Sequence, residues 1–274
     1  MKIIVAPTDF SDISLNSVNY AADMACVTGT ELSLLHVCVM PLSFSEVPVP
    51  AYSLEQVMND AEERLKQLQE KISTRTGGRL KVNTVVRQGT VVREIDDYCA
   101  DVNVYAVVMG AESAGKFERF LFGGRTIEAV KQLRWPLIVV PPDVKFSSIR
   151  QIGLACDFKD VVDTIPVKEI KSMVNEFGAK LHVLHVSNEI GEVFSDETVE
   201  ESGWLQEIIG DMNPKYHFIK GIDADNRIIE FAEKNKLDLL IIIPKKRNLF
   251  TKIFRNSHSK GLVLHSHVPV MVVQ

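Results

Sequence analysis

The chain has 274 residues, of which 46% are hydrophobic, and its formal net charge at pH 7 is −5. At about 100–200 residues per domain, this length predicts one large domain or two ordinary ones. The mild acidic balance argues against a general binder of nucleic acid or of an anionic membrane, because such proteins usually carry a basic excess.

Two further features of the sequence bear on the compartment. No apolar run approaches the roughly 18 residues that span a bilayer, and the first residues pass directly into a strand-like run without the pattern of a signal peptide. The four cysteines, Cys26, Cys38, Cys99 and Cys156, are widely spaced and form no CxxC pair. This spacing is typical of reduced structural thiols. We therefore expect a cytoplasmic protein.

Five short runs of the first half are apolar nearly throughout, which is typical of parallel strands covered on both faces. These predicted strands lie at residues 3–6, 32–39, 80–86, 105–109 and 137–140. Helical patterns lie between them, at residues 12–27, 54–72, 90–100 and 124–133. The alternation of strands and helices predicts an open, doubly wound sheet.

The second half repeats the first. Matching segments follow in the same order: residues 6–10 with 154–158, 34–37 with 183–186, Gly89 with Gly221, and 136–140 with 269–273. The corresponding strands are predicted at 152–155, 181–186, 216–220, 237–243 and 270–273. We therefore predict an α/β fold of two repeated doubly wound domains, residues 1–143 and 147–274. Each is expected to be an open five-stranded parallel sheet with helices on both faces.

Ligands of such sheets bind beyond the carboxyl ends of the strands, where the strand order reverses. Asp9 follows the first predicted strand and can accept hydrogen bonds from a ribose hydroxyl or an adenine amino group. The alternative is that Asp9 caps the next helix, a role that Ser11 or Asp12 can also fill.

A glycine-rich segment follows the fourth predicted strand and leads into a helix. Gly110, Gly123 and Gly124 allow the backbone to approach a ligand, and amides at a helix start favour phosphate. Arg125 and the Thr126 hydroxyl can add donors. The alternative is a flexible loop with glycines at a tight strand exit.

Part of this segment matches a phosphate-binding loop of another kind. Gly110-x4-Gly115-Lys116 fits the P-loop pattern except that Phe117 replaces the Ser or Thr that would hold magnesium. A P-loop normally follows the first strand of its domain, and this segment follows the fourth. We interpret the match as coincidence.

The first half resembles the universal stress protein family, and the resemblance extends to the second half. The family's phosphate signature is Gly-x2-Gly-x9-Gly-Ser/Thr, and Gly110, Ser113, Gly123 and Gly124 hold its four places with the spacing intact. Two of the four differ, since Ser113 stands for glycine and Gly124 for the hydroxyl residue. The segment Pro7, Thr8 and Asp9 matches the family's adenine-side segment, and Val37 matches its base-contacting position.

The resemblance implies an adenine nucleotide alpha hydrolase-like fold. It also implies a site for ATP or another adenine nucleotide in the first half, with Mg²⁺ as an accompanying ion. The residues that would form this site are Pro7, Thr8, Asp9, Val37, Gly110, Ser113, Gly123, Gly124, Arg125 and Thr126.

The second half departs further from the family's signature. Pro244, Arg247 and Asn256 replace the three glycines, and Ser257 alone fits. Proline removes an amide donor, and side chains obstruct the phosphates. A basic segment at residues 245–255 either docks an acidic partner or is a solvated loop. We predict that the second half is structural or has another ligand.

By resemblance, the chain is a non-enzymatic stress-response module. Family members commonly dimerise through their last strands, so residues 137–140 and 270–273 are expected to build a pseudo-dimer inside the chain. Further homodimerisation and an unidentified protein partner are left open.

Two alternatives remain, an interaction scaffold without a nucleotide and a weak ATP hydrolase. No paired carboxylates or Cys/His constellation supports the hydrolase. We propose no metal site from the sequence, because His182 and His185 lie three apart on a strand and therefore point to opposite faces.

Overall fold

The computed structural model describes residues 1–39, 51–111, 124–187, 196–244, 262–263 and 266–273. The chain divides into two compact units. The first comprises Met1–Gly110 and Gly124–Leu137, and the second comprises Ile138–Gln274 together with Ala111. The predicted domain boundaries at residues 143 and 147 stay a prediction.

In the first unit, parallel strands are ordered β3-β2-β1-β4. These strands are β1 (Ile3–Pro7), β2 (Glu31–Cys38), β3 (Val82–Gln88) and β4 (Val104–Gly110). Strand β5 (Leu137–Val140) follows in sequence. Strands β1, β2, β4 and β5 are buried nearly throughout, as their apolar runs predicted, whereas only Val82 is buried in β3.

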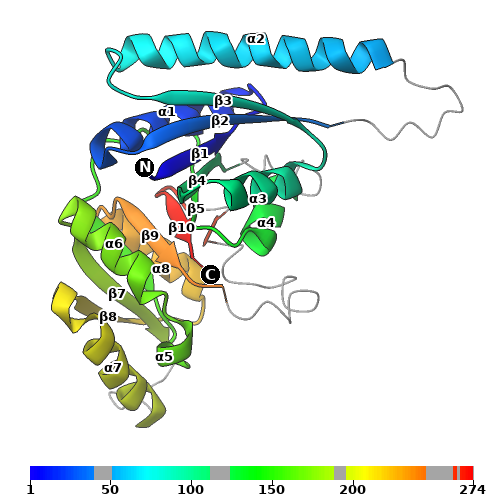
Figure 1. The fold of residues 1–274 in the computed structure, drawn as a ribbon. Coiled ribbons are helices and arrows are strands. Elements are labelled where there is room, and N and C mark those ends of the chain that lie inside the picture. The colour runs from blue at the N-terminus through cyan, green and yellow to red at the C-terminus, as the bar shows by residue number, and fades with distance from the viewer. Residues whose placement is uncertain (40–50, 112–123, 188–195, 245–261, 264–265, 274) are drawn as a thin grey trace, which may run out of the picture. The chain divides into compact units, whose positions relative to one another are not determined.

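The four helices of the first unit are α1 (Asp12–Thr28), α2 (Ala51–Arg75), α3 (Val91–Asp101) and α4 (Gly124–Gln132). In Figure 1, α1 and α2 lie on one face of the strands and α3 and α4 on the other. Arg75 of α2 pairs with Asp23 of α1 on the first face. On the second face, the Tyr98 hydroxyl of α3 lies 2.8 Å from the Ser33 hydroxyl of β2.

The second unit has the same strand arrangement. Its strands β6 (Gln151–Ala155), β7 (Lys180–Ser187), β8 (Lys215–Lys220), β9 (Leu239–Ile242) and β10 (Val270–Val272) follow the order β10-β9-β6-β7-β8 with parallel pairing. Its helices are α5 (Val161–Thr164), α6 (Val167–Phe177), α7 (Asp196–Ile209) and α8 (Ala224–Lys234), with a 3-10 turn η1 at Gly210–Met212.

The internal repeat extends to single backbone hydrogen bonds. The Thr8 amide donates to the Leu35 carbonyl at 2.9 Å, and the Cys156 amide donates to the Leu184 carbonyl at 3.0 Å. The further equivalent pairs are Gly89 to Cys38 with Gly221 to Ser187, and Val107 to Pro136 with Leu240 to Pro269. The predicted α/β fold of repeated, parallel units is confirmed.

Within the described part of the chain, no helix combines the length and the apolar character needed to cross a bilayer.

Candidate functional site

The strand order of the first unit reverses at β1. The chain passes from β1 to β2 on one side, whereas β4 pairs with β1 on the other side. This reversal is where open α/β sheets bind ligands. The residues that follow β1 and β4 therefore form the candidate site.

Asp9 lies in the loop after β1, and its carboxylate is oriented by the residues around it. Its Oδ1 accepts hydrogen bonds from the Ser11 hydroxyl at 2.6 Å and from the Ser11 amide at 3.0 Å. Partial burial opposes ionisation, but the bonds from Ser11 and Ser14 and the charge of Arg125 outweigh it, so the pKa of Asp9 lies below its usual value. The carboxylate is charged at neutral pH and half exposed.

The capping alternative for Asp9 is not what the structure adopts. Ser11 is the N-cap of α1, and its side chain accepts a hydrogen bond from the Ser14 amide. Because Ser11 fills the capping role, the second carboxylate oxygen of Asp9 remains directed to the site, where Arg125 reaches it.

The start of α4 brings a cation to Asp9. Arg125 Nη1 lies 3.9 Å from Asp9 Oδ2, and both side chains are 51% exposed. Such an exposed pair contributes little to stability, about 0–1 kcal/mol. The pair matters for ligand binding, because it brings a hydrogen-bond acceptor, a cation and the positive end of a helix dipole to one place.

The structure gives Thr126 a contact inside the first unit. Its side chain is buried, with 1% exposed, and its hydroxyl donates to the Gly110 carbonyl at 3.2 Å. The hydroxyl is therefore not a free donor for a ligand. Instead it ties the start of α4 to the end of β4.

Gly110 is required at the end of β4 for a steric reason. A Cβ at this position would lie 2.5 Å from Ile13 Cγ2 and 2.8 Å from the Ile13 carbonyl oxygen of α1. From the sequence, we expected Gly110 to let the backbone approach a ligand closely. The structure shows that it also allows α1 to pack against β4.

An aromatic support beneath the Asp9 loop was not recognised from the sequence. His36 Nδ1 donates to the Thr8 carbonyl at 2.8 Å, and the His36 ring lies 4.8 Å from the ring of Phe10. The Arg64 guanidinium of α2 lies 4.0 Å from the Phe10 ring centroid. Phe10 has a positive φ of 65°, which such packing must maintain.

The second unit contains the same support with different surroundings. His185 Nδ1 donates to the Cys156 carbonyl at 3.0 Å. The centroids of the His185 and Phe158 rings lie 4.8 Å apart. Phe158 has a φ of 51° and is 1% exposed. His36 recurs in the second half as His185, and Phe10 recurs as Phe158. This recurrence is the sequence signal from which the support could have been predicted.

The loop after β6 in the second unit also receives a carboxylate. Glu201 Oε2 of α7 accepts a hydrogen bond from the Val161 amide at 2.8 Å. The first amide of α5 is thereby occupied by an anion from the protein itself. The second unit also lacks a backbone amide donor at Pro244, which follows β9. Neither of these two positions of the second unit therefore offers an open amide to a ligand.

The predicted site residues differ in exposure. Asp9, Gly124 and Arg125 are exposed, Gly110 is half-buried, and Pro7, Thr8, Val37 and Thr126 are buried. Ser113 and Gly123 lie outside the described residues, as do the basic segment 245–255, Asn256 and Ser257. His182 contacts His217 and His185 contacts Phe218, and these successive residues of β8 point to opposite faces, as predicted. Among the described residues, no group of three or more His, Cys, Asp or Glu could hold a metal ion.

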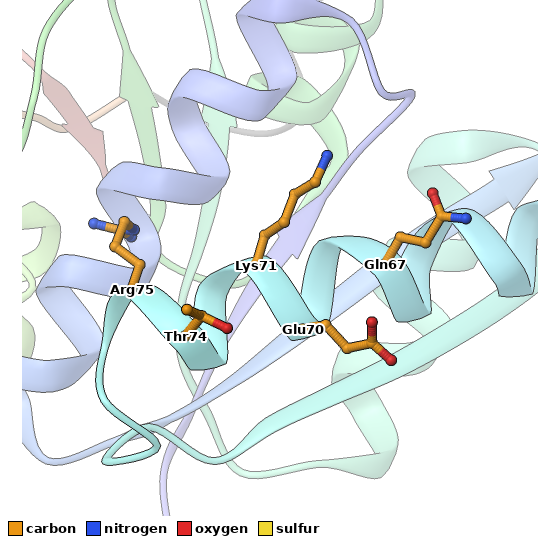
Figure 2. Close-up of a pocket in the computed structure, with 5 residues that line it drawn as sticks. All are labelled: Gln67, Glu70, Lys71, Thr74 and Arg75. Carbon is orange, nitrogen blue, oxygen red and sulfur yellow. The ribbon is translucent and has the colours of Figure 1, made fainter.

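A surface hollow lies elsewhere in the first unit. It has a volume of about 550 Å³ and is lined by Gln67, Glu70, Lys71, Thr74 and Arg75. Figure 2 shows these side chains projecting from successive turns of α2. Every lining residue comes from one helix and none from a strand end, so we do not identify the hollow with the ligand site.

The chain is similar to known proteins over most of its length. The family model described as the universal stress protein family matches residues 1–141 and 210–274. A universal stress protein of Methanocaldococcus jannaschii is 28% identical over 145 residues, which are 51% of this chain and 81% of that protein.

Two solved structures share the fold over nearly the whole chain. A universal stress protein from Archaeoglobus fulgidus is 21% identical with a TM-score of 0.74, over 99% of this chain and 96% of that one. A protein from Pseudomonas aeruginosa described as functionally unknown is 13% identical with a TM-score of 0.60, over 100% and 92%. At these identities the likeness is one of fold.

Proposed function

Since the chain belongs to the universal stress protein family, we propose that its first unit binds an adenine nucleotide, with ATP as the first candidate, as a non-catalytic stress-response module. The observation that carries the proposal is the meeting of Asp9 and Arg125 at the carboxyl ends of β1 and β4. Asp9 accepts hydrogen bonds and Arg125 binds anions. A nucleotide has groups that complement both, namely the ribose hydroxyls and the phosphates.

The two charges suit different parts of one ligand. The ionised Asp9 can accept hydrogen bonds from ribose hydroxyls, and these charge-assisted bonds are the stronger kind. Arg125 and the exposed amide at Gly124 lie at the start of α4, where the helix dipole favours phosphate. Mg²⁺ accompanying the nucleotide would neutralise part of the phosphate charge.

The proposal includes no chemical step. The Thr8 hydroxyl lies 3.0 Å from the Ser14 hydroxyl and accepts the Phe10 amide at 3.0 Å. Its partners are thus a hydroxyl and an amide, and neither is a base that would activate it. Binding without turnover is the function that these contacts favour.

The second unit is proposed not to hold a nucleotide in the same manner. Glu201 already accepts the Val161 amide at the loop after β6, so this amide is not available to a ligand. The lack of an amide at Pro244 removes a further donor. The pseudo-dimer, a further homodimer, a protein partner and a cytoplasmic location all stay predictions.

The matched residues Asp9 and Asp157 give the test. We expect calorimetric titration of ATP to show binding by the wild-type chain and a loss of about 10- to 100-fold in affinity for Asp9→Ala, as for a hydrogen bond to a charged group. Asp157→Ala removes the equivalent carboxylate of the second unit and is expected to bind ATP as the wild type does.

Other titration results would favour a different function or a different binding site. No binding by the wild-type chain would overturn the proposal and favour an interaction scaffold without a nucleotide. Equal losses in the Asp9→Ala and Asp157→Ala variants would place binding in both units, and a loss in Asp157→Ala alone would place it in the second. Release of phosphate from ATP would contradict the non-catalytic part.

A further inference from the structure

A cluster of two imidazoles lies in the second unit, away from the candidate ligand site. His182 comes from β7 and His217 from β8, and the two strands pair so that His182 is opposite Lys215. His217 is therefore the diagonal neighbour of His182, within reach of a long side chain. The His182 Nδ1 and the His217 Nε2 lie 2.9 Å apart.

The geometry identifies this contact as an in-line hydrogen bond. The two ring planes are nearly parallel, at an interplanar angle of 22°, and their centroids are 5.1 Å apart. With 2.9 Å between the facing nitrogens, the lone-pair directions point along one line. They do not converge on a common third point, as they would for two ligands of one metal ion.

The neighbouring Gln151 fixes where the protons lie. The His182 Nε2 is 2.7 Å from the Gln151 Oε1, and a carbonyl oxygen can only accept, so the proton of neutral His182 lies on Nε2. The His182 Nδ1 then accepts from the His217 Nε2–H. One further proton can be accommodated on the His217 Nδ1 with this bond intact, but a second proton, on the His182 Nδ1, places two N–H donors face to face.

The charges around the pair oppose protonation. Desolvation, the facing His217, Lys215 and Lys180 lower the pKa of His182, in that order of size. Desolvation and Lys215 lower the pKa of His217.

Among the described residues, no carboxylate contributes to the pKa shift of either histidine. From α8, the Phe231 ring lies 4.7 Å from the His217 ring. Of the charged residues of α8, Asp225 is half-buried, and the others are exposed, namely Arg227, Glu230, Glu233 and Lys234. On the β6 side, Asp238 accepts the Gln151 backbone amide at 2.9 Å, so its carboxylate is engaged with the backbone.

The first unit has non-titrating residues at the same places. The repeat aligns Ser33 with His182 and Val85 with His217, and the strand registers agree, because Ser33 is opposite Asn83 as His182 is opposite Lys215. Ser33 bonds to Tyr98 of α3, which is the counterpart of Phe231 in α8. The imidazole pair is thus a feature of the second unit alone among these matched positions.

We propose that the His182–His217 pair is an acid-sensitive latch, which holds β8 to β7 at neutral pH and releases it on acidification. Strand β8 lies at the edge of the described strand order, so β7 is its one hydrogen-bonded neighbour there. Its Phe218 is 45% exposed. Opening the latch loosens an edge strand that carries apolar surface, which gives the chain a direct response to acid.

The sign of the effect follows from the pKa directions. The folded pKa values lie below the ordinary 6.5, so the unfolded chain takes up protons first as the pH falls. The stabilisation is therefore complete above about pH 7 and is lost as the pH falls from 6.5 toward the lower folded values. Each pKa unit of lowering corresponds to about a tenfold change in the unfolding equilibrium constant.

The two tryptophans allow each unit to be followed within the full chain. Trp204 lies in the second unit and Trp135 in the first. With Trp135→Phe, urea unfolding followed by fluorescence reports the second unit, and with Trp204→Phe it reports the first. Unfolding curves are recorded between pH 7.5 and pH 5.5.

Three chains are compared in each background. The wild-type pair is expected to show a several-fold or larger rise in the unfolding constant of the second unit toward pH 5.5. The double variant His182→Ser with His217→Val, which installs the residues of the first unit, is expected to flatten this dependence. The control His267→Gln removes an exposed histidine, 81% exposed, and is expected to keep the wild-type dependence.

A second measurement decides the outcome even where the double variant fails to fold. NMR titration of the histidine Cε1 protons in the wild-type chain is expected to give lower midpoints for His182 and His217 than for His267. Amide hydrogen exchange corrected for intrinsic rates is expected to show protection lost first in β8. Equal midpoints for the three histidines, or the same pH dependence with and without the pair, would overturn the proposal.

Discussion

The Phe158→Ala variant is expected to destabilise the second unit by about 3–5 kcal/mol, the usual cost of removing a fully buried phenylalanine. Phe158 is 1% exposed. Its ring packs against His185 at 4.8 Å, Phe218 at 5.8 Å and Tyr216 at 6.5 Å between centroids. Truncation leaves a cavity that these neighbours can fill only in part, since the Phe158 backbone is fixed at a positive φ by the loop.

The equivalent Phe10→Ala variant provides the matched comparison. Phe10 is half-buried, and one of its neighbours is the exposed Arg64, so we expect a cost of about 1–2 kcal/mol from partial burial and a cation–π contact. Urea unfolding with the Trp204 and Trp135 reporters measures the two costs separately. Equal costs in the two units would contradict the asymmetric packing described here.

The Gly110→Ala variant is expected to destabilise the first unit by about 1–3 kcal/mol, as overpacking does in other well-packed interiors. The new methyl group would lie 2.8 Å from the Ile13 carbonyl oxygen. Because that atom is backbone, relief requires α1 to move away from β4. The same movement displaces the loop that carries Asp9 into α1, so nucleotide affinity is expected to fall together with stability.

Gly124→Ala is the control for this variant. A Cβ at Gly124 meets nothing within 4 Å, and alanine is preferred to glycine in a helix by about 0.5–1 kcal/mol. We therefore expect no loss of stability in urea unfolding of the Gly124→Ala chain. A Gly110→Ala chain as stable as the Gly124→Ala chain would show that the contact with Ile13 is not restrictive.

The strands and helices could be predicted because each is encoded locally. Continuous apolar runs marked all ten strands, and the ends differ from the observed ones by a few residues at most, as for β9, predicted at 237–243 and observed at Leu239–Ile242. The helical stripe of α2, predicted at 54–72, extends to Ala51–Arg75. These ends depend on capping and fraying, which periodicity alone does not determine.

The candidate residues of the site could be named from the sequence, but their contacts could not. Asp9 and Arg125 were both named, because they lie in the segments that follow β1 and β4. The bond of the Thr126 hydroxyl was not predicted, because its acceptor Gly110 lies 16 residues away and becomes its neighbour only when α4 docks. The pairing of His182 with His217, 35 residues apart, depends on the register of β7 and β8.

We expect the chain to hold one adenine nucleotide, in its first unit. Native mass spectrometry of the full chain in the presence of ATP counts the nucleotides bound to each chain. We predict that the signal saturates at one ATP per chain and that Asp9→Ala needs about 10- to 100-fold more ATP to reach the same occupancy. Two ATP molecules bound with equal occupancy, or one whose occupancy is unchanged in Asp9→Ala and reduced in Asp157→Ala, would contradict a single site in the first unit.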